Sequence, residues 1–217
     1  MCFSAEVSFG ASAVISTVGV LAVRKSTKKE QIFFAMVPLL FGMQQFFEGW
    51  LWVALANDGY PIIETIATYG FLLFAQLIWP VWIPLSVFTM ETHPKRKRLI
   101  GFALATGLTL SFLLGYRMLF YPVTAHIDQH HIYYSVGHFQ STNWWSGIFY
   151  LLPAVFPFVF SSRRAINYLG LLMLLLFVVA KVFYLKYMIS TWCLFAALLS
   201  VYIFFILKRE EAAAARS

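Results

Sequence analysis

Charged residues are scarce in this chain of 217 residues. Only 12% of the residues are Asp, Glu, Lys or Arg, whereas 61% are hydrophobic and 19% are aromatic. A soluble globular domain carries about 25% charged residues and cannot bury so large an apolar fraction. The scarcity of charge therefore excludes an ordinary soluble protein and predicts an integral membrane protein.

Acidic residues are scarcer than basic ones, with 9 Asp and Glu against 16 Lys and Arg, which gives a net charge of +7. A basic protein can bind nucleic acid when its cations cover one soluble face. Here the cations form short clusters between apolar runs, at 24–29, 95–98, 163–164 and 208–209. We therefore expect the lipid bilayer as a partner, and no nucleic acid.

Seven apolar windows are long enough to cross the ~30 Å hydrocarbon core, which takes roughly 20 helical residues. They lie near 4–23, 31–56, 62–90, 99–120, 144–161, 165–185 and 187–207. Each basic cluster follows an odd-numbered window, and the connections after the second and fourth windows contain no Lys or Arg. Because positively charged loops stay in the cytoplasm, we expect an all-α bundle of about seven transmembrane helices, with the N-terminus outside and the C-terminus cytoplasmic.

No segment of the chain is polar enough for an appended soluble domain. We expect a single transmembrane domain over residues 1–209 and a disordered tail over 210–217, part of which is of cloning origin. The first window has no basic stretch before it and no small-residue cleavage site after it, so we expect it to be retained as a helix.

Four of the charged side chains inside the predicted windows converge on the outer half of the bundle: Glu6, Glu48, Arg117 and Lys181. A charge at the membrane centre costs about 2.5–3.5 kcal/mol on insertion scales, so each one needs a reason. The second window is the most polar. The side chains that share one face of its helix are Gln44, Gln45, Glu48 and Trp52. Gly42 and Gly49 add a small-residue strip that lets a neighbouring helix approach closely.

These residues predict an outward-facing polar pocket for a small polar or amphipathic molecule, or for a lipid. Its predicted ligand-binding residues are Glu48, Gln44, Gln45, Glu6, Trp52, Arg117 and Lys181. The pattern leaves a second interpretation open, in which Glu48 pairs with Arg117 or Lys181 and the glutamines bond across helices simply to hold the bundle together.

The predicted outer loop, residues 122–143, holds four of the five histidines. The candidate metal ligands there are His126, Asp128, His130, His131 and His138. Imidazole and carboxylate suit zinc or another divalent metal, the one cofactor that this sequence suggests, but the spacing matches no standard zinc signature. A pH-responsive lid and an interfacial loop with incidental histidines are the alternatives.

Cysteine is nearly absent, and both cysteines, Cys2 and Cys193, are expected toward the outer side. An external disulfide, a nucleophilic Cys2 and two unreactive thiols all stay open.

Two motifs carry a resemblance to a known family: MCFSAEVSF at residues 1–9 and FGMQQFFEGWLW at residues 41–52. With these motifs the chain resembles an uncharacterised family of bacterial multi-pass membrane proteins. The matching positions are Cys2, Ser4, Glu6, Gln44, Gln45, Glu48 and Trp52. The resemblance implies the bacterial cytoplasmic membrane as the location and brings no activity with it.

In helix count and layout the chain is also similar to the seven-helix metal hydrolases that include alkaline ceramidases and hemolysin-III-like receptors. It lacks their late His-x-x-x-His motif, because the last two windows contain no histidine. Three functions therefore stay open: a carrier or sensor with a polar pocket, a metal-dependent membrane hydrolase acting on a lipid or amide with Glu48 as its general base, and a structural subunit of a membrane complex. Whether the chain is an enzyme, and its oligomeric state, are left undecided.

Overall fold

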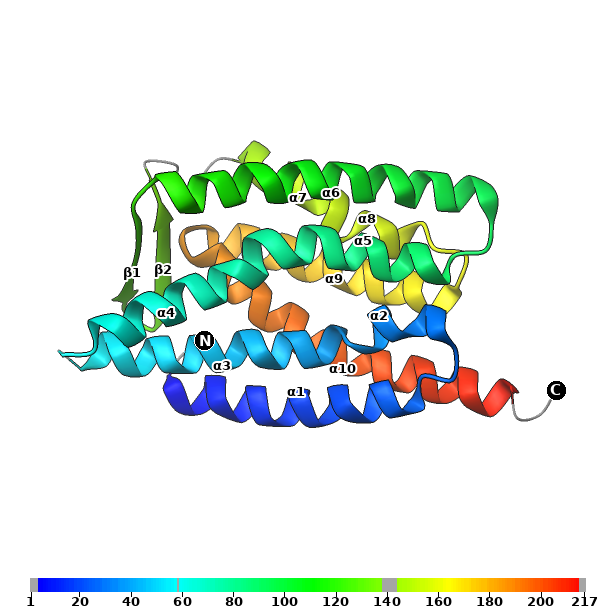
Figure 1. The fold of residues 1–217 in the computed structure, drawn as a ribbon, viewed down its shortest axis with the longest axis horizontal. Helices are drawn as coiled ribbons and strands as arrows, with labels where there is room; N and C mark the ends of the chain where they lie inside the picture. The colour runs from blue at the N-terminus through cyan, green and yellow to red at the C-terminus, as the bar shows by residue number, and fades with distance from the viewer. Residues whose placement is uncertain (1–3, 58, 138–143, 215–217) are drawn as a thin grey trace.

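The computed structural model describes residues 4–57, 59–137 and 144–214, and the side chains of the last stretch over 149–212. Long helices run side by side along the longest axis, and a short β hairpin lies across one end (Figure 1). The helices are α1 (Ala5–Lys25), η1 (Lys29–Gln31), α2 (Ile32–Ala35), α3 (Val37–Ala56), α4 (Pro61–Leu72), η2 (Leu73–Ile78), α5 (Trp79–Met90), α6 (Pro94–Phe120), α7 (Trp144–Ala154), α8 (Phe156–Val159), α9 (Arg164–Phe183), η3 (Leu185–Tyr187) and α10 (Met188–Ala214).

Six helical stretches of the described chain are long and apolar enough to cross a membrane. They are Ala5–Lys25, Lys29–Ala56, Pro61–Met90, Pro94–Phe120, Arg164–Phe183 and Leu185–Ala212. The predicted class, a helical membrane protein, is confirmed. The predicted window at 144–161 forms the two shorter helices α7 and α8, which meet at Val155. Pro153 and Pro157 flank this break, and each removes a backbone donor from the helix.

The third stretch, Pro61–Met90, changes from α-helical to π-helical winding shortly before Pro80. Residues Leu73–Ile78 form a π-helical segment, and α5 then begins with Trp79 and Pro80. Pro80 has no N–H to donate to the carbonyl of Gln76, so the regular ladder is interrupted there. The Pro80 carbonyl faces Gly107 of α6, where an added Cβ would lie 1.9 Å from its oxygen. This glycine allows α5 and α6 to pack closely.

Helices α1 and α3 pack along the predicted glycine strip. The Ser12 hydroxyl donates to the Gly42 carbonyl at 2.8 Å. A Cβ on Gly42 would lie 2.1 Å from the Ser16 oxygen, and one on Gly49 would lie 2.7 Å from the Phe9 ring. The structure thus shows the close approach that the small residues predict.

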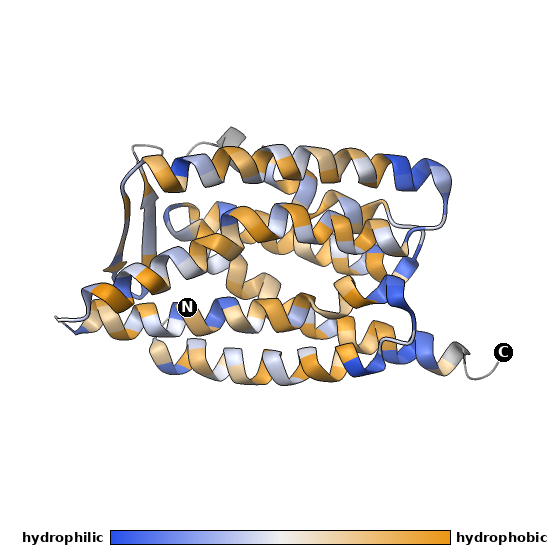
Figure 2. Cartoon of the chain, in the orientation of Figure 1, coloured by the Kyte–Doolittle hydropathy of each residue, from blue (hydrophilic) through white to orange (hydrophobic). Residues whose placement is uncertain are grey.

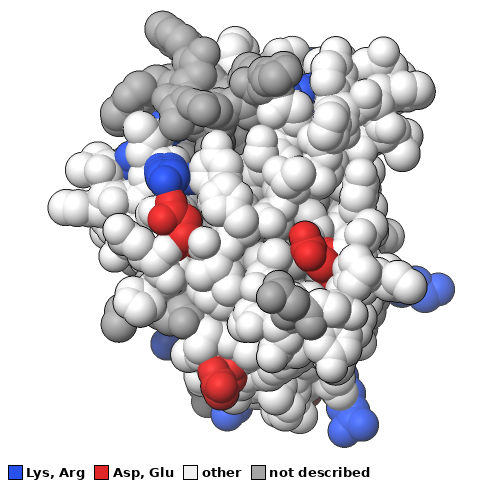
Figure 3. All heavy atoms as spheres, turned by 90° about the vertical axis from the view of Figure 1, so that its left-hand side faces the viewer, with Lys and Arg blue, Asp and Glu red and all other residues white. Residues whose placement is uncertain are grey.

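The predicted outer loop contains strands, which the all-α prediction omitted. Strands β1 (Val123–Asp128) and β2 (His131–Val136) pair antiparallel, with Val123 opposite Val136 and Asp128 opposite His131. Alternate side chains of the hairpin are buried against α3, α4 and α6, and the Tyr134 ring stacks on Phe71 with centroids 4.7 Å apart. The hairpin therefore covers one end of the helix bundle. Figure 3 shows this end face, where charged groups are few and scattered.

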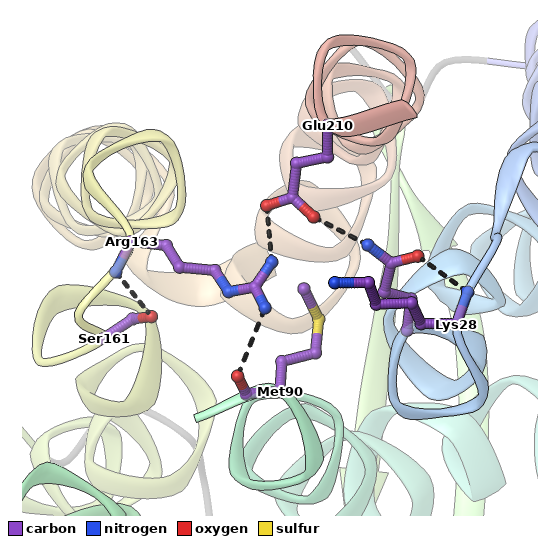
Figure 4. A network of polar contacts seen from close by, with 6 residues as sticks. Lys28, Met90, Ser161, Arg163 and Glu210 are labelled. Carbon is purple, nitrogen blue, oxygen red and sulfur yellow. Dashed lines mark hydrogen bonds and ion pairs between the residues drawn. The ribbon is translucent and has the colours of Figure 1, made fainter. Parts of the chain in front are cut away.

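The other end of the bundle collects the basic clusters, seen as blue segments in Figure 2. There Glu210 accepts hydrogen bonds from Arg163 at 2.5 Å and from Gln31 at 2.7 Å (Figure 4). Lys25 pairs with Glu211 at 3.0 Å. The predicted disordered tail begins at 210, whereas α10 stays helical to Ala214 because these contacts attach its last turns to α1, η1 and α9.

Candidate functional site

The Glu48 carboxyl group lies inside the bundle and is fully buried, with 0% of the residue exposed. It is on the face of α3 that turns toward α10. The Ser190 hydroxyl, in the first turn of α10, donates to Oε1 at 2.5 Å, and Gln45 Nε2 donates to Oε2 at 3.1 Å. Two neutral donors from two helices thus hold one carboxyl group.

No described Lys or Arg side chain forms an ion pair with Glu48. Arg117, a predicted partner, donates instead to the backbone carbonyl of Val136 at 2.8 Å and so attaches α6 to the hairpin. Lys181 on α9 is buried, 3% exposed, but is not among the groups that interact with Glu48. Neither Arg117 nor Lys181 therefore forms the ion pair with Glu48 that the purely structural interpretation predicts.

A second polar layer lies one turn before Glu48 in α3, toward the start of that helix. Gln44 is fully buried, and its Oε1 accepts a hydrogen bond from the Trp79 indole at 2.7 Å. The buried, free thiol of Cys193 on α10 lines the same small cavity as Trp79. Helices α3, α5 and α10 therefore meet at this level.

Several buried polar atoms around these layers have no hydrogen-bond partner among the described residues. They are Gln45 Oε1, Gln76 Oε1, Thr191 Oγ1, Trp192 Nε1 and Trp52 Nε1. Each buried polar group left unsatisfied costs about 1–3 kcal/mol, so native proteins keep few of them. Of these atoms, Gln45 Oε1 belongs to a side chain that contacts Glu48, and an unsatisfied buried atom of this kind is typical of a place that takes up another polar species.

A cavity of about 20 Å³ lies next to the Gln44 layer. Its walls come from α3, α5, α7, α8, α9 and α10, and the lining residues are Phe41, Trp79, Ile83, Tyr150, Ala154, Phe158, Met173, Trp192, Cys193 and Ala196. This volume accommodates about one water-sized species. None of the predicted ligand-binding residues lines this cavity, and its volume is far smaller than an amphipathic ligand needs.

Two other predicted pocket residues, Glu6 and Trp52, lie at different places in the bundle. Glu6 is exposed in the first turn of α1. Trp52 is buried one turn beyond Glu48, among the apolar side chains beneath the hairpin. Of the seven predicted ligand-binding residues, the structure thus brings together Glu48, Gln44 and Gln45.

The candidate metal ligands are spread over the hairpin. His126 and His130 are exposed, whereas His131 is buried and its ring stacks on Tyr187 at 4.4 Å. Burial lowers the pKa of His131. Asp128 bonds to Lys186 and Tyr187, and the Lys186 hydrogen bond, followed by that of Tyr187, lowers the pKa of Asp128. Among the described residues no group of three or more His, Cys, Asp or Glu side chains is placed to hold a metal, and His138 and Cys2 lie outside them.

A comparison with protein families matches one family model, a family of unknown function (DUF6629), over residues 1–217. The chain belongs to this family. No curated protein matches the DUF6629 chain, and no solved structure matches it. The site of this DUF6629 protein is therefore interpreted from its own geometry.

Two residues of the site were not predicted from the sequence of this DUF6629 protein. Trp79 binds Gln44, and Tyr150 lines the cavity and donates to the Ala75 carbonyl. Trp79 follows Gln76, a polar residue of the third predicted window, by three positions, which was a usable signal. Tyr150 lies in the shortest and most weakly predicted window, where no helix face was assigned.

Proposed function

We propose that this protein binds a small polar ligand at the Glu48 layer and acts as a carrier or a sensor in the membrane. The observation that carries the proposal is the buried Glu48 carboxyl group, which is held by Ser190 and Gln45 and is paired with no described cation. A carboxylate in an apolar interior is neutralised by a proton or balanced by a bound partner.

A purely structural polar network is the competing explanation, and its energetics are poor. Hydrogen bonds between membrane helices contribute about 0.6 kcal/mol on average, whereas inserting an acidic residue costs about 2.5–3.5 kcal/mol. The unpartnered atoms Gln45 Oε1 and Thr191 Oγ1 add to that cost. A ligand bound at the Glu48 layer gives the carboxyl group and Gln45 Oε1 a partner.

The proposal includes the orientation of the chain, with the N-terminus outside and α7 and α8 together forming the fifth of seven passes. The basic clusters at 24–29, 95–98, 163–164 and 208–209 support this, because retained positive charge marks the cytoplasmic side. Glu48 is eight residues before the end of α3 at Ala56, or about 12 Å along the helix. The site is then in the outer half of the membrane, beneath the hairpin.

The test is a thermal unfolding screen of the purified protein in detergent, because a ligand that binds only the folded state raises Tm. The probes are potassium and ammonium chloride, methylammonium, glycine, glucose and phosphate. We expect at least one probe to raise Tm of the native protein and to lose that effect in Glu48→Gln. Glu64→Gln, which changes a glutamate of α4 away from the site, is the matched control and keeps the effect. A native protein that responds to no probe contradicts the proposal, as does a response that survives Glu48→Gln.

The metal-dependent hydrolase function stays a prediction from the sequence. It requires side chains of the hairpin to come together around a metal ion. The structural subunit likewise stays a prediction, since it needs a partner protein.

A further inference from the structure

The end of the bundle that carries the basic clusters has more positive charge than its own acidic groups balance. Glu210 and Glu211 form ion pairs with cations of the chain, and the buried Glu91 accepts hydrogen bonds from two backbone N–H groups. Among the described acidic residues at this end, only Glu30 is exposed, whereas each of the four basic clusters has exposed Lys or Arg side chains. The surface therefore keeps a positive charge that the protein itself does not neutralise.

The starts of α6 and α9 are held together by hydrogen bonds at this end. The Arg96 guanidinium donates to the carbonyl of Ser161 at 2.6 Å. The backbone N–H of Ser162 donates to Glu91, just before α6, at 2.7 Å. Ser161 and Ser162 lead directly into α9, whose first residue is Arg164. Two basic clusters that are far apart in the sequence are therefore neighbours in the fold.

On both helices an exposed cation is followed along the same face by an exposed aromatic side chain. Arg98 of α6 is exposed, and Phe102, four residues later, is 62% exposed. Arg164 of α9 is exposed, and Tyr168, four residues later, is 60% exposed. Residues four apart share a helix face. In a membrane, such a face places the cation among the lipid headgroups and the aromatic ring just below it, at the boundary with the acyl chains.

We propose that the starts of α6 and α9 form a binding site for the phosphate group of an anionic phospholipid, with Arg98 and Arg164 as its ligands. A guanidinium group presents parallel N–H donors that match the oxygen atoms of a phosphate. Each Lys or Arg beside a membrane strengthens the binding of anionic headgroups about fivefold. The ligand is a lipid and not a soluble phosphate, because the exposed faces that continue from these cations lie against acyl chains. This site is separate from the Glu48 layer and does not depend on the proposed function.

The experiment measures Tm of the full-length protein in a neutral detergent, titrated with phosphatidylglycerol or with phosphatidylcholine of the same acyl chains. Both lipids cover apolar helix faces, but only phosphatidylglycerol carries a net negative charge. We expect phosphatidylglycerol to raise Tm by roughly 5–10 °C more than phosphatidylcholine at about 100 times its Kd. Sodium phosphate at the same ionic strength should leave Tm unchanged.

Two results with the native protein would overturn the proposal without any variant. Equal Tm values in the two lipids would show that the negative headgroup is not recognised. A rise in sodium phosphate as large as that in phosphatidylglycerol would show that the site takes a soluble anion and not a lipid.

A double variant tests the two arginines. Arg98→Gln with Arg164→Gln removes one cation from each helix and should raise the phosphatidylglycerol concentration for half of the Tm rise about tenfold to thirtyfold. The matched control is Arg24→Gln with Lys208→Gln, which removes two exposed cations at the same end. These lie on α1 and α10, on the other side of the bundle from α6 (Figure 1).

The control should leave the lipid titration unchanged in about 0.15 M salt, where charges more than about 8 Å apart are largely screened. Equal weakening in the two double variants would mean that only the total charge of this end matters, and would overturn the site. An unchanged titration in Arg98→Gln with Arg164→Gln would overturn it as well.

Discussion

Gly42 lies where α1 packs closely against α3, and this contact sets the position of the helix that carries Glu48. The Ser16 backbone nitrogen would lie 2.9 Å from a Cβ at Gly42, so more than a side-chain rotation is needed to make room for one. The Ser12 hydroxyl bonds to the carbonyl of the same glycine. The contact between α1 and α3 therefore requires a residue without a Cβ at position 42.

Gly42→Ala should destabilise the protein by about 1–3 kcal/mol, because α1 must move away from α3. The measurement is thermal unfolding, in which about 2–4 °C corresponds to each kcal/mol for a chain of this size. Gly10→Ala on α1 is the control, since its added Cβ would meet nothing within 4 Å and alanine is the better helix former. Equal effects of the two substitutions would show that the α1–α3 contact does not limit stability.

The α3 motif was predictable at the level of single residues because helical spacing alone places Gln44, Gln45 and Glu48 on one face. The contacts made by the side-chain ends of Arg117 and Lys181 were not predictable in this way. A long side chain reaches several neighbours, and only the folded hairpin supplies the Val136 carbonyl that Arg117 binds. Trp79 was missed because its hydrogen bond joins it to Gln44, a residue of another helix that is 35 positions away in the chain.

Two loops at the basic end of the bundle are joined by Glu91. Its carboxylate accepts hydrogen bonds from the backbone N–H groups of His93 at 2.8 Å and Ser162 at 2.7 Å. Burial acts to raise the pKa of Glu91, but the hydrogen bonds from His93 and Ser162 outweigh it and the pKa is lowered. The contact therefore stabilises the connection between α5 and α6 against that between α8 and α9.

Glu91→Gln should lower stability by about 1.5–3 kcal/mol at neutral pH, because an amide cannot accept both hydrogen bonds through charged oxygens. Since the pKa of Glu91 is lowered on folding, its contribution is present above the usual value of about 4.3 and is lost as pH falls through the lower folded value. Thermal unfolding between pH 7 and pH 3 measures this loss, which should be smaller in the variant. Glu30→Gln, on an exposed residue of η1, is the control. An unchanged pH profile in Glu91→Gln would contradict the assignment.

At the level of whole elements, hydrophobic length predicted the long helices, because a run that must cross lipid leaves a clear signal. The interruptions were harder to place. Pro80, Pro153 and Pro157 are visible in the sequence, but prolines are tolerated in membrane helices and do not by themselves say where a helix breaks. The hairpin was missed because its strands are short and lie between two membrane segments.

The molecule has two unlike ends. One carries the basic clusters and the Glu210 network, and the other is covered by the hairpin and has few charges (Figures 2 and 3). This asymmetry was predictable from the sequence, since the basic clusters alternate with the apolar windows. It supplies the basis for the orientation that we propose.

Reporter fusions test that orientation in a bacterial host. A green fluorescent protein fused after the C-terminus should fluoresce, because the proposed C-terminus is cytoplasmic. Alkaline phosphatase inserted between Gln129 and His130, at the hairpin turn, should be active because that turn lies outside. The reverse pair of results would invert the orientation and place Glu48 nearer the cytoplasm.

The central claim is that the buried Glu48 layer takes up a ligand. The most direct measurement compares Tm of the native protein with that of Glu48→Gln across the same probes, under identical detergent and ionic strength. The account predicts a probe-specific rise for the native protein that is absent from Glu48→Gln and retained in Glu64→Gln. Identical responses of the native protein and Glu48→Gln to every probe would contradict it.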